Sequence, residues 1–185
     1  TKLKAIYEKM RAFIEQKQPN EVDLPEIRDV KAFIRKTEAI AGARYAGLED
    51  ENIHFMALPF YETGKTVKNP VTDKDVELTI ELLQKIRPHQ IFAAGDFADP
   101  HGTHLVCFRI IIQAMEQLRE TEKWAQECWL WMYRGAWHEF DTHEIEMAVP
   151  LSPQEVERKK NAIFQHQSQK DRPVFPGDDE REFWV

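Results

Sequence analysis

Apolar residues with a helical period alternate along the chain with short apolar runs of strand length. In residues 2–16 they recur every three or four positions, which predicts an amphipathic helix. A second helix is expected from Pro25, a residue suited to a first helical turn, to about Tyr45, with Gly47 as its stop. Buried strands are predicted for four runs, residues 53–58, 90–94, 128–133 and 145–149.

Two capping signals mark the starts of further helices. Thr72 is followed three residues later by Asp75, which approximates a capping box and predicts a helix from that point. Ser152 is followed by Pro153, which suits a first turn, and by Glu155, which can reach back to the cap. The helix that begins there is expected to run to about His166.

Helices that alternate with strands are typical of an α/β sheet, mainly parallel, with helices on both faces. We expect one domain over the 185 residues. Within it, a loop at 95–102 leads from a strand into a helix at 103–119. Residues 170–185 carry prolines, a glycine and several acids, so we expect a mostly irregular C-terminal segment.

Composition excludes two classes of partner and suggests a compartment. The chain has 25 Lys and Arg against 32 Asp and Glu, which argues against non-specific nucleic-acid binding. The best apolar run, 105–112, is interrupted by Arg109 and is too short to span a membrane, so no membrane partner is expected. The two cysteines, Cys107 and Cys128, form no disulfide framework and suggest the reduced cytoplasm.

The densest group of chemically capable residues follows the strand predicted at 90–94. Asp96, Asp99, His101 and His104 lie within nine residues, at the carboxyl end of a strand, where α/β sheets place their sites. A neutral imidazole is a good zinc ligand, and a second one nearby can act as an acid or stabilise an oxyanion. The alternative is a loop whose side chains cap a helix and meet solvent. The spacing alone favours neither.

Other candidates are interpreted as structural. Cys107 is expected to pack on the buried face of its helix. His54 lies in a predicted strand and is read as a core histidine. The polar residues at 138–144 are read as a solvated loop. A strand-period aromatic stripe is expected to pack rather than to stack on bases; it consists of Trp129, Trp131 and Tyr133.

Three sequence blocks carry a family resemblance. They are Arg35-Lys36-Thr37-Glu38, Asp99-Pro100-His101-Gly102-Thr103-His104, and Lys160-Asn161-Ala162 with His166-Gln167-Ser168-Gln169. They resemble the R-x-x-E, second histidine and K-x-x-A…H-x-S-Q motifs of the LmbE-related, PIG-L-type de-N-acetylases. That resemblance implies a Rossmann-like fold and a zinc hydrolase that removes acetyl groups from N-acetylglucosamine-containing substrates.

The resemblance also implies roles for individual residues. His104 matches the zinc-binding histidine of the family, and His101 matches the histidine that stabilises the tetrahedral intermediate. Arg35 and Asp99 match positions at the substrate site. Thr103 stands where the family usually has an aspartate before its last histidine.

The family's other two zinc ligands and its catalytic base lie in an A/P-H-P-D-D motif after the first strand. Neither Pro-His pair of this sequence, Pro88-His89 or Pro100-His101, continues into Asp-Asp. We therefore expect the 185 residues to be a partial domain, truncated at its N-terminus. On its own the chain is expected to be inactive and to bind zinc weakly or not at all.

Further blocks resemble a subgroup in which this domain follows a glucosamine-6-phosphate deaminase (isomerase) domain, as in Bacteroidetes-type fusion proteins. They are Phe60–Gly64, Tyr133–Trp137 and Ala148–Pro153. The implied function is hydrolysis of the N-acetyl group of an amino sugar or its phosphate. One alternative is a non-catalytic regulatory or sugar-binding domain of an amino-sugar-phosphate deaminase. The other is a scaffold that forms homo-oligomers through exposed strand edges.

Overall fold

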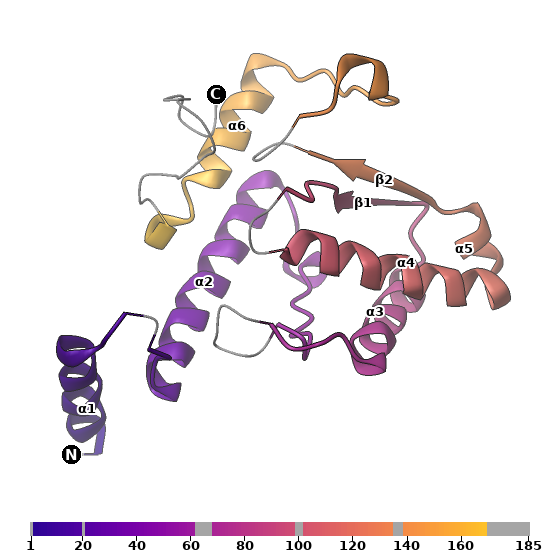
Figure 1. Ribbon diagram of the computed structural model, residues 1–185. Coiled ribbons are helices and arrows are strands. Elements are labelled where there is room, and N and C mark those ends of the chain that lie inside the picture. Colours follow the sequence, from indigo (N-terminus) through magenta and orange to yellow (C-terminus); the bar gives the residue numbers. More distant parts are fainter. Residues whose placement is uncertain (1, 20, 62–67, 99–101, 135–138, 170–185) are drawn as a thin grey trace. The chain divides into compact units, whose positions relative to one another are not determined.

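The computed structural model describes residues 2–19, 21–61, 68–98, 102–134 and 139–169 (Figure 1). The chain divides into two compact units. Described residues up to His54 and from Pro150 onward belong to the first unit, and those from Phe55 to Val149 belong to the second. The predicted C-terminal segment at 170–185 lies outside the described residues.

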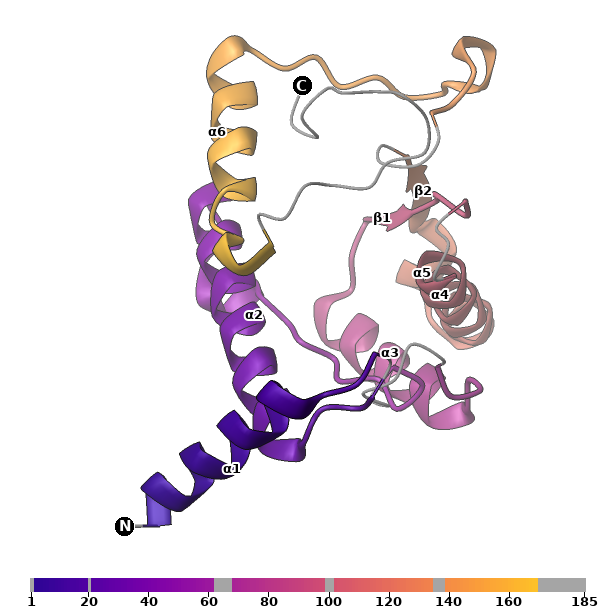
Figure 2. The same ribbon diagram turned by 60° about the vertical axis from the view of Figure 1, so that its left-hand side comes forward.

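The first unit is helical. Its elements are α1 (Lys2–Gln16), α2 (Pro25–Ala46), the short 3-10 helix η1 (Asp50–Asn52), α6 (Pro153–Ile163) and the 3-10 helix η3 (Gln167–Gln169). Helix α6 packs against α2, which Figures 1 and 2 both show. The predicted starts of α2 and α6 are confirmed, and α6 ends three residues before the expected His166.

Local chemistry accounts for the end of α2 and the start of α6. Gly47 ends α2 in the left-handed region with a φ of +104°, which only glycine adopts without strain, and its N–H donates back to the last turn. At the start of α6, the Ser152 hydroxyl accepts a bond from the Glu155 N–H. The Glu155 carboxylate in turn accepts from the Ser152 N–H at 2.6 Å, which completes the predicted capping box.

The second unit combines helices with a parallel strand pair. Its elements are α3 (Asp73–Ile86), β1 (Gln90–Ala94), α4 (Thr103–Thr121), α5 (Lys123–Glu127), β2 (Trp129–Tyr133) and the 3-10 helix η2 (Thr142–Glu144). The strands pair in register from Gln90 opposite Trp129 to Ala94 opposite Tyr133. Helix α4 packs against β1 and α3. The α/β class is thereby confirmed, whereas the Rossmann-like arrangement stays a prediction.

Helix α4 contributes buried side chains to two apolar clusters. One consists of Phe60, Val76, Ile110 and Ala114, and the other of Met115, Leu118, Ala125 and Cys128. Cys107 packs against the first group, as predicted. Burial raises the pKa of the Cys107 and Cys128 thiols, so neither is poised as a thiolate.

The start of α3 is held by a fully buried carboxylate. The predicted capping box is confirmed, because Asp75 accepts from both the N–H and the hydroxyl of Thr72 at 2.9 Å. Its other oxygen accepts from the Phe60 N–H at 2.9 Å. Burial raises the pKa of Asp75, but these donors outweigh it and hold the pKa below its usual value.

Two of the four predicted strands are wrong. Residues 53–58 are irregular, because Ala57 has a φ of +47° and interrupts the extended backbone. Residues 145–149 are also irregular, and Val149 is 70% exposed. A short apolar run becomes a strand only where a neighbour accepts and donates its backbone hydrogen bonds. His54 is exposed, so its interpretation as a core histidine is wrong as well.

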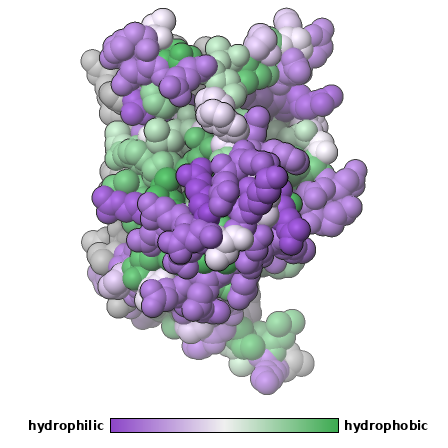
Figure 3. Space-filling model, turned by 90° about the vertical axis from the view of Figure 1, so that its right-hand side faces the viewer, coloured by the Kyte–Doolittle hydropathy of each residue, from purple (hydrophilic) through white to green (hydrophobic). Residues whose placement is uncertain are grey.

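The strand pair is less buried than predicted. Trp129 is 64% exposed and Tyr133 is 56% exposed. Trp129 stacks on Trp131 with ring centroids 5.8 Å apart, so these two rings of the aromatic stripe pack on each other. Hydrophilic side chains dominate the face on which α5 lies (Figure 3). None of the described helices combines the length and apolarity that crossing a membrane would require.

Candidate functional site

The histidine site predicted from the sequence spans the loop after β1 and the start of α4, of which the structure describes residues 95–98 and 102–104. The Gly95 N–H donates to the Tyr133 carbonyl at 2.8 Å, and Asp96 is only 4% exposed. A Cβ at Gly95 would lie only 2.7 Å from the Met132 Cβ. The close approach of the Gly95 backbone to β2 therefore requires glycine at this position. His104 lies in the first turn of α4, with its Nδ1 3.3 Å from the Asp96 carbonyl oxygen.

The contact between His104 and the Asp96 carbonyl bears on which ring nitrogen carries a proton. A carbonyl oxygen only accepts, so the Nδ1 must carry the proton in this contact. The Nε2 is then the nitrogen with the lone pair. Metal-binding histidines commonly donate their second ring N–H to a backbone carbonyl, which orients the ring and raises its basicity.

Sequence reasoning missed Arg134, the first residue after β2. Its Nε donates to the Gly95 carbonyl at 3.4 Å, and its Nη1 donates to the Glu139 carbonyl at 3.3 Å. Its guanidinium lies 4.1 Å from the centre of the Phe140 ring. Arg134 therefore joins the loops that follow both strands, and its position just beyond a parallel strand was the available signal.

The predicted site residues fall in different places. His104 lies at the carboxyl end of the strand pair, as expected. Asp99 and His101 lie outside the described residues. Arg35 is exposed on α2 of the first unit. Among the described residues, His, Cys, Asp and Glu side chains form no group of three that could hold a metal ion.

In the first unit, a carboxylate joins two of the resemblance blocks. The Glu38 Oε1 accepts from the Ser168 N–H at 2.6 Å, and its Oε2 accepts from the Ser168 hydroxyl at 2.6 Å. The Ser168 hydroxyl holds the pKa of Glu38 below its usual value. The block at 35–38 is therefore bonded directly to the block at 160–169, a pairing that no local sequence signal reveals.

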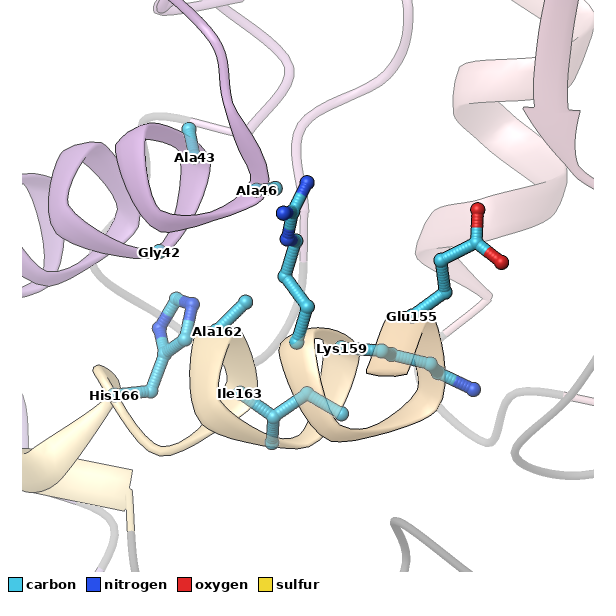
Figure 4. Close-up of a pocket in the computed structure, with 9 residues that line it drawn as sticks. Gly42, Ala43, Ala46, Glu155, Lys159, Ala162, Ile163 and His166 are labelled. Atoms are coloured by element: carbon cyan, nitrogen blue, oxygen red, sulfur yellow. The ribbon is translucent and has the colours of Figure 1, made fainter. Parts of the chain in front are cut away.

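Next to this contact, residues of α2 and α6 line an open cleft of about 440 Å³ (Figure 4). Its lining residues combine small apolar side chains of both helices with three basic groups and one acid: Gly42, Ala43, Ala46, Ala162, Ile163, Arg158, Lys159, His166 and Glu155. A Cβ at Gly42 would lie 3.1 Å from the Ala162 carbonyl oxygen and 3.3 Å from the His166 Nε2. Gly42 therefore lets the helices approach closely.

Fold and site together define an α/β protein with an oriented imidazole at the carboxyl end of parallel strands. The chain is similar to a protein of Bacteroides thetaiotaomicron named "Putative glucosamine-6-phosphate deaminase-like protein", with 47% identity over 179 residues. The match covers 96% of this chain and 27% of that protein, so the chain spans about a quarter of its relative's length. No family model matches the chain. No solved structure matches it.

Proposed function

We propose that this chain is part of a larger amino-sugar-processing protein. In this proposal it contributes to a zinc-dependent site that removes the N-acetyl group of an amino sugar or its phosphate. The similarity to a deaminase-like protein along nearly the whole chain supports an amino-sugar substrate. The three blocks that resemble de-N-acetylase motifs support amide hydrolysis.

The orientation of His104 carries the proposal. The Asp96 carbonyl, 3.3 Å from Nδ1, directs the lone pair to Nε2, which is the form of histidine that binds zinc. Zinc at such a site lowers the pKa of a bound water and polarises a carbonyl group. The proposal assigns the remaining ligands and the catalytic base to the family's A/P-H-P-D-D motif.

Three further residues have roles in this proposal. His101 donates a hydrogen bond to the oxyanion that forms when water adds to the acetyl carbonyl. Asp99 and Arg35 contact the substrate, and the permanent charge of Arg35 suits a hydroxyl-rich or phosphorylated sugar. In the structure Arg35 contributes to the low pKa of Glu38, the residue that holds Ser168.

The test is acetate release by the full-length polypeptide that contains this chain. The substrates are N-acetylglucosamine and N-acetylglucosamine 6-phosphate, each with zinc present. His104→Ala is expected to lower kcat/KM by about 100-fold or more, because it removes a metal ligand. His143→Ala is the matched control, since His143 is exposed in η2 of the same unit.

Two results would count against the proposal. Acetate release at the wild-type rate by the His104→Ala variant would remove His104 from the site. The absence of acetate release from every N-acetylated amino sugar, by a folded protein supplied with zinc, would refute the hydrolase proposal itself.

A further inference from the structure

We propose that the cleft between α2 and α6 binds the phosphate group of a small sugar phosphate. The phosphate part follows from the side chains of the cleft alone. The choice of a sugar as the group that carries the phosphate rests on the proposed function. The site belongs to the first unit and differs from the histidine site after β1.

Positive charge is concentrated on the α6 side of the cleft. Arg158 and Lys159 are adjacent residues of α6, and both line the cleft. Within the described part of the chain, no salt bridge engages either cation. A guanidinium and an ammonium together offer charge-assisted hydrogen bonds to phosphate oxygens.

The one acid of the cleft is engaged elsewhere. The Glu155 carboxylate accepts the Ser152 N–H at 2.6 Å as part of the α6 capping box. That backbone bond, the Ser152 hydroxyl and the charge of Arg158 together keep the pKa of Glu155 below its usual value. Glu155 lies at the opposite end of the lining residues from His166 in Figure 4. Arg158 and Lys159 outnumber this one carboxylate, which leaves a net positive charge among the lining side chains.

His166 adds a hydrogen-bond donor at the other end. The Gln169 Nε2 lies 3.4 Å from the His166 Nδ1, and an amide nitrogen only donates. With the Gln169 amide placed in this way, Nδ1 accepts and Nε2, the nitrogen next to Gly42, is the ring nitrogen that carries a proton. The cleft therefore has cations along α6 and a ring N–H at its end, and Glu155 is the one acidic side chain among its lining residues.

The floor of the cleft suits the carbon skeleton of a sugar. Ala43 and Ala46 of α2 and Ala162 and Ile163 of α6 also line the cleft, and their side chains consist only of aliphatic carbon groups. The faces of a pyranose ring present C–H groups that pack on such a surface. A volume of about 440 Å³ lies within the usual range for small-molecule sites.

The experiment is an NMR titration of the 185-residue chain, without zinc, with three probes: inorganic phosphate, glucosamine 6-phosphate and glucosamine. We expect saturable shifts of the Gly42 and Ala46 amides with the first two probes, with millimolar or tighter dissociation constants. Glucosamine 6-phosphate should bind several-fold more tightly than phosphate. Glucosamine alone should cause no saturable shift.

Paired variants identify the residues responsible. Replacing both Arg158 and Lys159 with Gln should weaken phosphate binding by about tenfold or more, since it removes both charge-assisted contacts. The control replaces Lys2 and Lys4 of α1 with Gln, which removes the same charge from the same unit and should change binding less than about twofold. Circular dichroism of each variant verifies that the helices are intact.

The outcomes separate this proposal from the hydrolase proposal. Absence of saturable phosphate binding, or equal binding by the Arg158 and Lys159 variant and its control, would refute the phosphate site. Equal affinities for phosphate and glucosamine 6-phosphate would refute the sugar part. Neither result depends on acetate release, because the titration contains no zinc and no N-acetylated substrate.

Discussion

Glu38 on α2 and Ser168 in η3 are 130 residues apart in the sequence, yet both carboxylate oxygens of Glu38 accept hydrogen bonds from Ser168 at 2.6 Å. One bond comes from the backbone N–H and the other from the hydroxyl. The end of the α6 segment is thereby fixed against α2 at the point where the cleft ends at His166.

Replacing Glu38 with Gln should loosen this contact. A carboxamide has one accepting oxygen, so either the N–H or the hydroxyl of Ser168 loses its acceptor. We expect hydrogen exchange of the Ser168 amide to become several-fold faster. Glu8→Gln, an exposed change on α1, is the control. Unchanged Ser168 protection in Glu38→Gln would show that the bidentate contact does not hold η3.

Gly42→Ala should push α6 away from α2. The new Cβ would meet the Ala162 carbonyl at 3.1 Å and His166 at 3.3 Å, and relieving such overpacking costs about 1–3 kcal/mol of unfolding free energy. Gly47→Ala is an informative comparison, because its cost of about 1 kcal/mol arises from the positive φ and not from a clash. Only Gly42→Ala should shift the NMR signals of Ala162 and His166. Equal shifts in both variants would contradict this account.

Asp75→Asn should destabilise the second unit by about 1–3 kcal/mol, measured by urea unfolding. Asn retains one accepting oxygen, so the N–H of Phe60 or of Thr72 is left without its acceptor in a buried place. Glu81→Gln, on an exposed position of the same helix, should change the free energy by less than about 0.5 kcal/mol. Similar losses in the two variants would mean that the buried carboxylate contributes nothing specific.

Acid should destabilise the same unit. The donors from Phe60 and Thr72 lower the pKa of Asp75 in the folded state, so its stabilising contribution is present above the unfolded pKa of about 4. That contribution is lost as the pH falls through the folded pKa. The unfolding free energy of the wild type should therefore decrease below about pH 4 more steeply than that of Asp75→Asn. Parallel pH profiles would contradict the assignment.

The elements that the sequence predicts well are those with local signals at both ends. Helix α3 has its capping box at Thr72, and α2 has Pro25 at its start and Gly47 at its end. These signals act within a few residues and do not require knowledge of distant neighbours. The strand pair was predictable because β1 and β2 are apolar and lie on either side of a helical pattern.

The predictions that are wrong depended on partners distant in the sequence. The runs at 53–58 and 145–149 are apolar enough for strands, but no strand of the described chain pairs with them. In the same way, Trp129 and Tyr133 alternate as buried residues would, yet one face of the pair stays exposed. Burial depends on what packs against a face, which periodicity alone does not specify.

At the candidate site, too, features with local sequence signals were predictable, whereas contacts between distant residues were not. The position of His104 at the start of α4 followed from a strand, a loop and a helix in sequence. Its contact with the Asp96 carbonyl and the bond from Arg134 to Gly95 depend on loop geometry. The bonds between Glu38 and Ser168 span most of the chain and appear only once α6 packs on α2.

Zinc content tests the central claim, that His104 is a metal ligand, most directly. The full-length polypeptide that contains this chain, dialysed and measured by elemental mass spectrometry, should retain about one zinc ion per molecule. His104→Ala should lose it and His143→Ala should keep it, while the 185-residue chain alone should retain none tightly. A full complement of zinc in His104→Ala, or tightly bound zinc in the 185-residue chain, would contradict the account.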